Sequence, residues 1–318
     1  MSGAVLLADA GGTFTRLALA EDGVIGPQSV VESGAHASFA EAARRYLAQT
    51  GGRPRRAAIA AAGPLVHGVV TLTNGPGWRI APDEIAAALA LDEVRVVNDF
   101  AALAAAAPHL SGAALGPIAP GEADPNGAIA VIGPGTGLGV ALLAPLGGGR
   151  YQVLPGEGGH AGLSPVTPRE MAVLAALVAS LGHVKAEHVL SGGGLETLWR
   201  TLAALDGAPD ADAPAAAEIA ARAAGRACAR SCEAVALFTG WLGGFAGDVA
   251  LIAGATGGVY LAGGILPRWG TLFDAAAFRA RFIAKGTHRA LMEAIPVRLI
   301  LDPLAAFRGL LSLFDGAR

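Results

Sequence analysis

The strongest constraint on the fold is a short pattern that the sequence uses twice. Residues 5–23, VLLADAGGTFTRLALAEDG, place Asp9 and a Gly-Gly-Thr turn between the apolar runs Val5 to Ala8 and Leu17 to Ala20. Residues 128–148, AIAVIGPGTGLGVALLAPLGG, repeat this plan around a Gly-Thr-Gly turn. Short apolar runs bounded by turn residues are typical of buried strands. The sequence therefore predicts two related strand–turn–strand units, and with them a duplicated core.

The rest of the first third alternates between strand and helix patterns. A Ser38–Glu41 capping box predicts a helix over residues 39–50, and Pro82 predicts the start of another. The other expected elements are strands in 23–33, 56–64, 67–74 and 93–99, and helices in 82–91 and 100–110. The Gly- and Pro-rich residues 111–127 predict a domain boundary.

The second part of the chain is mostly helical up to about Ala253. A strand in GVYLAGGI (258–265), a helix over about 272–284, a strand in IPVRLIL (295–301) and a closing helix from Pro303 follow. Strands that alternate with helices predict an α/β protein. We expect a small α/β domain over 1–110, completed by a C-terminal helix in 302–318, and a large α/β domain over 111–301.

Composition and charge exclude several classes of protein. Lysine plus arginine number 23 against 26 acidic residues, and the longest basic run is residues 53–56, so we expect no nucleic-acid partner. The start, MSGAVLLADA, lacks the charged region of a signal peptide. The two cysteines, Cys228 and Cys232, fit buried small side chains in a reduced, cytoplasmic protein. Residues 234–267 are very apolar but broken by glycines, which favours a core helix followed by a strand over a membrane span.

The two Gly-Thr turns contain the backbone and side-chain groups that bind phosphate. Glycine lets a ligand approach the backbone closely, and successive backbone N–H groups bind anions. The second turn, GPGTGLG (133–139), matches neither of two known phosphate-binding patterns: it has no Gly-Lys-Ser/Thr, and Leu138 occupies the place of the last glycine in a dinucleotide fingerprint.

Polar residues gather at three further places. Asn98 and Asp99 follow a β-branched strand and begin a helix, where a ligand contact or a helix N-cap is expected. Glu157 and His160 lie in the glycine-rich LPGEGGHAGL, which favours ligand contact over an incidental solvated pair. Glu187 alone would be an ordinary charged residue, and the scattered histidines predict no zinc site.

Taken together, these stretches resemble bacterial glucokinase along nearly the whole chain. The resemblance rests on Asp9 to Thr13 with Arg16, Asn98-Asp99-Phe100, Gly133 to Gly139, Gly156 to His160, TLTNGPGW (71–78), VLSGGGL (189–195) and LAGGILPR (261–268). It implies the actin-like ATPase (ribonuclease H-like) fold, in which two α/β domains enclose a cleft. One departure is Phe14, which replaces the asparagine common after Gly-Gly-Thr.

The resemblance also implies roles for individual residues. Asp99 is implied as the catalytic base, and Asp9 as the Mg²⁺ ligand, through water. The implied sugar-binding residues are Asn98, Asp99, Glu157, His160 and Glu187; the implied ATP-binding residues are Asp9, Ala10, Gly11, Gly12, Thr13, Gly135, Thr136, Gly137, Gly263 and Gly264. Arg16 is expected to pair with a nearby carboxylate or to orient the first turn.

These roles imply ATP-dependent phosphorylation of D-glucose at the 6-hydroxyl, with ATP and Mg²⁺ as cofactors and no membrane partner. Two alternatives stay open: a kinase for mannose, fructose or an amino sugar, and a non-catalytic sugar sensor of the same fold. Asp99 argues against the sensor, because sugar binding alone does not require a base. A homodimer is compatible with the sequence.

Overall fold

The computed structural model describes residues 3–63, 65–72, 75–208 and 212–314. It confirms the α/β class, and the described chain divides into two compact units. Unit 1 comprises residues 1–111 and 302–318, and unit 2 comprises residues 112–301. Several stretches named above include residues outside this description: residues 1–2 in MSGAVLLADA, residue 64 in the expected strand 56–64, residues 73–74 in the expected strand 67–74 and in TLTNGPGW, and residues 315–318 in the C-terminal segment.

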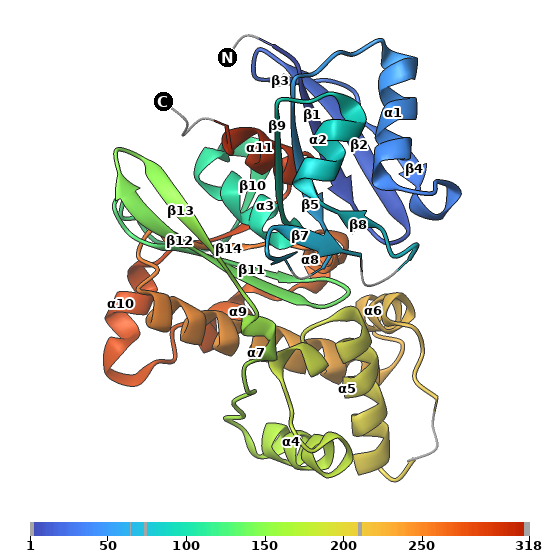
Figure 1. The fold of residues 1–318 in the computed structure, drawn as a ribbon. Coiled ribbons are helices and arrows are strands. Elements are labelled where there is room, and N and C mark those ends of the chain that lie inside the picture. Colours follow the sequence, from blue (N-terminus) through green and yellow to red (C-terminus); the bar gives the residue numbers. More distant parts are fainter. Residues whose placement is uncertain (1–2, 64, 73–74, 209–211, 315–318) are drawn as a thin grey trace. The chain divides into compact units, whose positions relative to one another are not determined.

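Unit 1 is built on a mixed sheet that starts with the first strand–turn–strand pattern (Figure 1). The strands β1 (Val5–Ala10) and β2 (Phe14–Glu21) pair antiparallel, so this prediction is confirmed. The strands β5 (Arg56–Ala61) and β9 (Glu93–Asn98) extend the sheet in parallel beyond β1. Asp9 and Asn98 therefore lie at the carboxyl ends of strands, the edge where α/β sheets bind ligands.

Both faces of this sheet are covered, which explains why its strands are apolar at successive positions. Leu6 and Ala8 face a core formed with α1 (Phe39–Thr50) and α2 (Pro82–Leu89). Val5 and Leu7 face the opposite core, formed with α3 (Asp99–Ala106) and α11 (Ala305–Ser312). Side chains alternate between the faces of a strand, so each strand contributes to two cores.

Two expected strands of unit 1 differ in detail from the structure. Residues 23–33 do not form one strand but two short ones, β3 (Val24–Ile25) and β4 (Ser29–Glu32), and each pairs with β2. Pro27 lies between them and has no N–H to continue a ladder. Residues 67–74 contain the short strand β7 (Val69–Thr71), which pairs with β6 (Leu65–Val66) and β8 (Arg79–Ile80) in a separate small sheet.

Unit 2 repeats the pairing plan of unit 1. The strands β11 (Ile129–Pro134) and β12 (Leu138–Gly147) pair antiparallel, and β14 (Gly258–Leu261) and β15 (Val297–Ile300) follow in parallel beside β11. In unit 1, β2, β1, β5 and β9 have the same order and the same sequence of antiparallel and parallel neighbours. This correspondence supports the predicted duplication.

Two strands of unit 2 were not expected from the sequence. The strand β10 (Leu115–Ala119) lies inside the Gly- and Pro-rich segment that was assigned as a boundary, and pairs with β15. It is an edge strand whose register shifts after Pro117, and such positions tolerate proline. The strand β13 (Arg150–Gly156) forms the other edge, beside β12.

The longest helix of unit 2 is α7 (Ala229–Ala253). The others are α4 (Pro168–Leu181), α5 (Gly192–Leu205), α6 (Ala216–Ala224), α8 (Ile265–Trp269), α9 (Ala275–Phe282) and α10 (Arg289–Ala294). Of these, α5, α6 and α9 pack against α7. By length and composition α7 could cross a membrane, but 56% of its most apolar window is buried inside the structure. Phe238, Trp241 and Leu242 belong to the main core of the unit, so α7 has the burial of a core helix.

Candidate active site

The first Gly-Thr turn is held by polar contacts from its own unit. The Gly11 N–H donates to the Phe14 carbonyl at 3.0 Å, which closes the turn between β1 and β2. Ser33 braces this turn: its hydroxyl donates to the Gly11 carbonyl at 2.8 Å, and its N–H donates to the Thr13 carbonyl at 2.9 Å. Thr13 itself is exposed, so the loop presents a free edge to a ligand. Sequence reasoning missed Ser33, which lies twenty residues farther along the chain.

Arg16 has a definite partner in the structure. Asp9 and Arg16 lie directly opposite each other on β1 and β2, and the guanidinium forms an ion pair with Asp9 Oδ2, with Nε 3.1 Å away. The guanidinium also lies over the Phe307 ring, 5.8 Å from its centroid. The expectation that Arg16 pairs with a nearby carboxylate is therefore confirmed. It fixes the Asp9 carboxylate beside the turn.

Asn98 and Asp99 occupy the junction between β9 and α3. Asn98 is the N-cap: its Oδ1 accepts from the N–H groups of Phe100 and Ala101, and its Nδ2 donates to the Gly63 carbonyl at 3.2 Å. The N-cap alternative is thus correct for Asn98. Since an amide has two N–H donors, one remains for a ligand.

Asp99 is the first helical residue, and it is accessible to solvent. Desolvation by the surrounding atoms raises its pKa above the usual aspartate value, and the charge of Asp9 raises it further, against the Phe100 N–H that stabilises the carboxylate. A carboxylate with a raised pKa that stays accessible is suited to accept a proton.

The second Gly-Thr turn lies between β11 and β12 in unit 2. The Gly135 N–H donates to the Gly137 carbonyl at 2.8 Å, and the Gly135 carbonyl accepts from Gly192 N–H at 2.9 Å. Thr136, at the tip, is exposed. Gly263 follows β14 and approaches β11 so closely that a Cβ there would lie 2.4 Å from the Pro134 carbonyl oxygen. Gly263, which Gly264 follows, therefore lies beside the second turn.

Glu157 immediately precedes, and His160 ends, one short 3₁₀ turn, η4 (Gly158–His160), which rests on β12. The His160 N–H donates to the Glu157 carbonyl at 3.0 Å. Gly159 makes this packing possible, because a Cβ there would lie 2.1 Å from the Leu138 carbonyl oxygen. Both flanking side chains are exposed on this turn.

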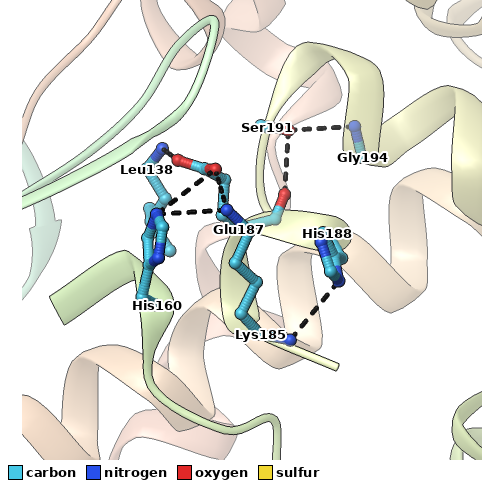
Figure 2. Close-up of polar contacts among 7 residues, drawn as sticks. All are labelled: Leu138, His160, Lys185, Glu187, His188, Ser191 and Gly194. Atoms are coloured by element: carbon cyan, nitrogen blue, oxygen red, sulfur yellow. Dashed lines mark hydrogen bonds and ion pairs between the residues drawn. The ribbon is translucent and has the colours of Figure 1, made fainter. Parts of the chain in front are cut away.

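Glu187 lies on a second 3₁₀ turn, η5 (Ala186–His188), and reaches back to the second Gly-Thr turn (Figure 2). Its Oε2 accepts from the Leu138 N–H at 2.9 Å. Its Oε1 accepts from Lys185 Nζ at 2.8 Å and lies 3.9 Å from His160 Nε2. Burial raises the pKa of Glu187, but the Lys185 and Leu138 hydrogen bonds outweigh this, so the pKa lies below its usual value and the group is an anion at neutral pH.

The predicted site residues thus form two sets, one in each unit. Unit 1 brings Asp9, Asp99 and the first turn to one sheet edge. Unit 2 brings Glu187 and His160 together at the second turn, whereas no side-chain hydrogen bond or ion pair links Glu157 to them among the described residues. Lys185 was missed. The one available signal is that only two lysines occur in the chain, Lys185 and Lys285.

The described residues contain no group of three or more His, Cys, Asp or Glu side chains that could hold a metal ion. Mg²⁺ does not require such a cage, since it usually keeps several waters and binds one or two carboxylates together with substrate phosphates. Asp9, with Asp99 close enough to feel its charge, supplies oxygen donors of this kind.

Comparison with known proteins gives consistent matches. A family model described as Glucokinase matches residues 6–316. The glucokinase of Nitrobacter hamburgensis is 40% identical over 311 residues, covering 97% of this chain and 96% of that protein. The glucokinase of Paramagnetospirillum magneticum is 41% identical over 316 residues, covering 98% of each. A crystal structure of a glucokinase from an Antarctic psychrotroph matches with a TM-score of 0.91 at 36% identity and full coverage of both chains, which confirms the expected fold.

Proposed function

This chain belongs to the glucokinase family, and from that premise we propose that it transfers the γ-phosphoryl group of ATP to the 6-hydroxyl of D-glucose, giving glucose 6-phosphate and ADP. The observation that carries the chemistry is Asp99, an accessible carboxylate with a raised pKa at the carboxyl edge of the unit 1 sheet. A sugar hydroxyl is a poor nucleophile at neutral pH. Asp99 accepts its proton as the new bond to phosphorus forms.

The sugar is held by groups that match its hydroxyls. Asn98 has one N–H donor left, and the carboxylates of Glu157 and Glu187 accept from hydroxyl groups. His160 contributes a ring nitrogen. Since Asn98 and Asp99 belong to unit 1 and the others to unit 2, we propose that glucose binds to residues of both units and draws them together. Closure of this kind limits wasteful transfer of the phosphoryl group to water.

ATP binds, in this proposal, through the backbone of both Gly-Thr turns. The first loop comprises Asp9, Ala10, Gly11, Gly12 and Thr13, and the second comprises Gly135, Thr136 and Gly137, with Gly263 and Gly264 on the adenosine side. Thr13 and Thr136 are exposed at the turns, where their hydroxyls reach phosphate oxygens. Asp9 would hold a Mg²⁺ ion through water, and the ion would supply positive charge to neutralise the phosphates of the nucleotide. Arg16 keeps Asp9 oriented for this role.

Three finer assignments complete the proposal. The reaction is the first step of glycolysis and takes place in the cytoplasm, which suits the free thiols of Cys228 and Cys232. The preferred sugar is glucose. A homodimer stays a prediction, which light scattering on the purified protein tests.

The test is an assay of ADP release with glucose, mannose, fructose, glucosamine and galactose. We expect glucose to give the highest kcat/KM and galactose a value lower by about a hundred-fold or more. An axial hydroxyl would leave two polar partners unpaired, and each such loss costs roughly 1–3 kcal/mol. No ADP release with any of these sugars would refute the function, and equal kcat/KM for glucose and galactose would refute the preference.

A further inference from the structure

Lys185 lies at the centre of the polar cluster in unit 2, although no role is implied for it above. It immediately precedes η5, and its backbone forms an isolated bridge with Gly162, while the Ala186 N–H donates to the Ala161 carbonyl at 2.7 Å. The two short turns η4 and η5 are thereby joined side by side. The Lys185 ammonium lies 2.8 Å from Glu187 Oε1 and 3.1 Å from His160 Nε2 (Figure 2).

The Lys185 ammonium determines which hydrogen-bonding role its neighbours can have. It has three donors and no acceptor, so His160 Nε2 must accept from it and the ring proton is on Nδ1. A cationic imidazolium would place two positive charges 3.1 Å apart. Lys185 therefore selects the neutral tautomer of His160 that carries its proton on Nδ1. It also holds the Glu187 carboxylate from the side opposite to the Leu138 N–H.

One ammonium donor of Lys185 is left over. Glu187 and His160 take two, and no third acceptor for Nζ is present among the described residues. The Lys185 side chain is only 19% exposed, compared with 27% for Glu187 and 57% for His160. A poorly hydrated donor with no partner is unfavourable, which indicates that a ligand supplies the acceptor.

The charge of the cluster indicates which ligand fits. The ammonium and the carboxylate cancel, and the imidazole is neutral, so the cluster has no net charge to attract a phosphate. A hydroxyl group fits, because it can accept from Lys185 and donate to Glu187 at the same time. A sugar presents such groups.

We propose that Lys185 is a sugar-binding residue of this site, which holds Glu187 and His160 in place and donates its remaining hydrogen bond to a hydroxyl of the bound hexose. This deepens the proposed function and rests on it. The alternative is that the ion pair of Lys185 with Glu187 only stabilises the fold.

The experiment compares Lys185→Met with Lys285→Met, which removes the other lysine. Lys285 lies in the same unit, pairs with Asp248 at 2.5 Å and is as little exposed, so it controls for the loss of a partly buried ion pair. The KM values for glucose and ATP and kcat are measured for glucose and its 1-, 2-, 3- and 4-deoxy analogues. For Lys185→Met we expect the glucose KM to rise about ten- to a hundred-fold, from loss of a charged hydrogen bond, and the ATP KM to stay within about two-fold.

The deoxy analogues separate contact from mere stabilisation. For the analogue that lacks the contacted hydroxyl, wild type and Lys185→Met should have similar KM values, whereas the other analogues keep the penalty. An unchanged glucose KM, or an equal penalty for every analogue, would overturn the inference. A wild-type protein that phosphorylates none of these sugars would instead refute the proposed function.

A second measurement needs no sugar and no activity. The ¹⁵N shifts of the His160 ring, recorded at about pH 8, report which nitrogen carries the proton. We expect the proton on Nδ1 in the wild type and a shift toward a mixture of tautomers in Lys185→Met. A wild-type ring with its proton on Nε2 would overturn the arrangement on which the inference depends.

Discussion

Replacing Gly137 by alanine tests whether the second Gly-Thr turn positions the sugar-binding carboxylate. A Cβ at residue 137 would lie 2.5 Å from Glu187 Oε2, well inside van der Waals contact. The φ of Gly137 is not in the left-handed range, so an alanine backbone is tolerated there. The Glu187 carboxylate is the end of a flexible side chain and is the group that moves. In moving, it loses the 2.9 Å hydrogen bond from the Leu138 N–H.

The size of the effect follows from that bond. A hydrogen bond to a charged group contributes about 1.5–3 kcal/mol, and about 1.4 kcal/mol corresponds to a factor of ten. Glucose affinity should therefore fall about ten- to a hundred-fold in Gly137→Ala. The same loss lowers the stability of the folded protein, so Tm should fall by several degrees at most.

The assay is calorimetric titration with glucose, with the KM for ATP measured alongside. Gly193→Ala, in the same unit, is the matched control, because a Cβ there meets nothing within 4 Å. If Gly137→Ala binds glucose as tightly as Gly193→Ala does, Glu187 does not act from the position that the Leu138 N–H gives it.

Four further predictions concern the base, the two units and the metal. Asp99→Asn should lower kcat by about 10²–10⁴-fold while glucose binding stays within about three-fold, and a kcat within a few-fold of wild type would remove Asp99 from the mechanism. Because the pKa of Asp99 is raised, activity should decline on acidification at a pH above the ordinary aspartate value of about 3.9, since protonated Asp99 cannot act as a base; a wild-type acid limb at that ordinary value contradicts the assignment. Saturating glucose should reduce the radius of gyration in small-angle scattering, and no change would count against binding by both units. Elemental analysis of the purified protein should find no stoichiometric zinc, and activity should require Mg²⁺. One zinc per chain would contradict the prediction that the histidines form no zinc site.

The elements that the sequence predicted correctly are those determined by local pattern. The continuous apolar run of β1 and the Ser38 N-cap of α1 involve residues near one another in the chain. The strand β10 was missed because its sequence, LGPIA, contains glycine and proline, and only pairing with β15, whose partner residue for Leu115 is Ile300, makes it a strand. Residues 23–33 were predicted as one continuous strand because the break at Pro27 depends on how β3 and β4 each pair with β2.

The same distinction applies to the candidate site. A nearby carboxylate could be expected for Arg16 from the sequence, and the short turn places Asp9 opposite it on two adjoining strands. Lys185 could not be assigned, because its role depends on His160, which η4 brings to it from 25 residues away. No repeating pattern in the sequence indicates that these two 3₁₀ turns lie side by side in the folded chain.

The helix α11 determines when unit 1 can be completed as the chain is made. Its Phe307 and Leu310, with Phe314 just beyond, cover the face of the first sheet that includes Val5 and Leu7. A ribosome synthesises these residues only after every strand of unit 2. Until then only α3 covers this face of the first sheet, so part of its apolar surface stays open to aggregation while unit 2 is synthesised. A chain that stops after residue 301 would carry a whole second unit beside an unfinished first one.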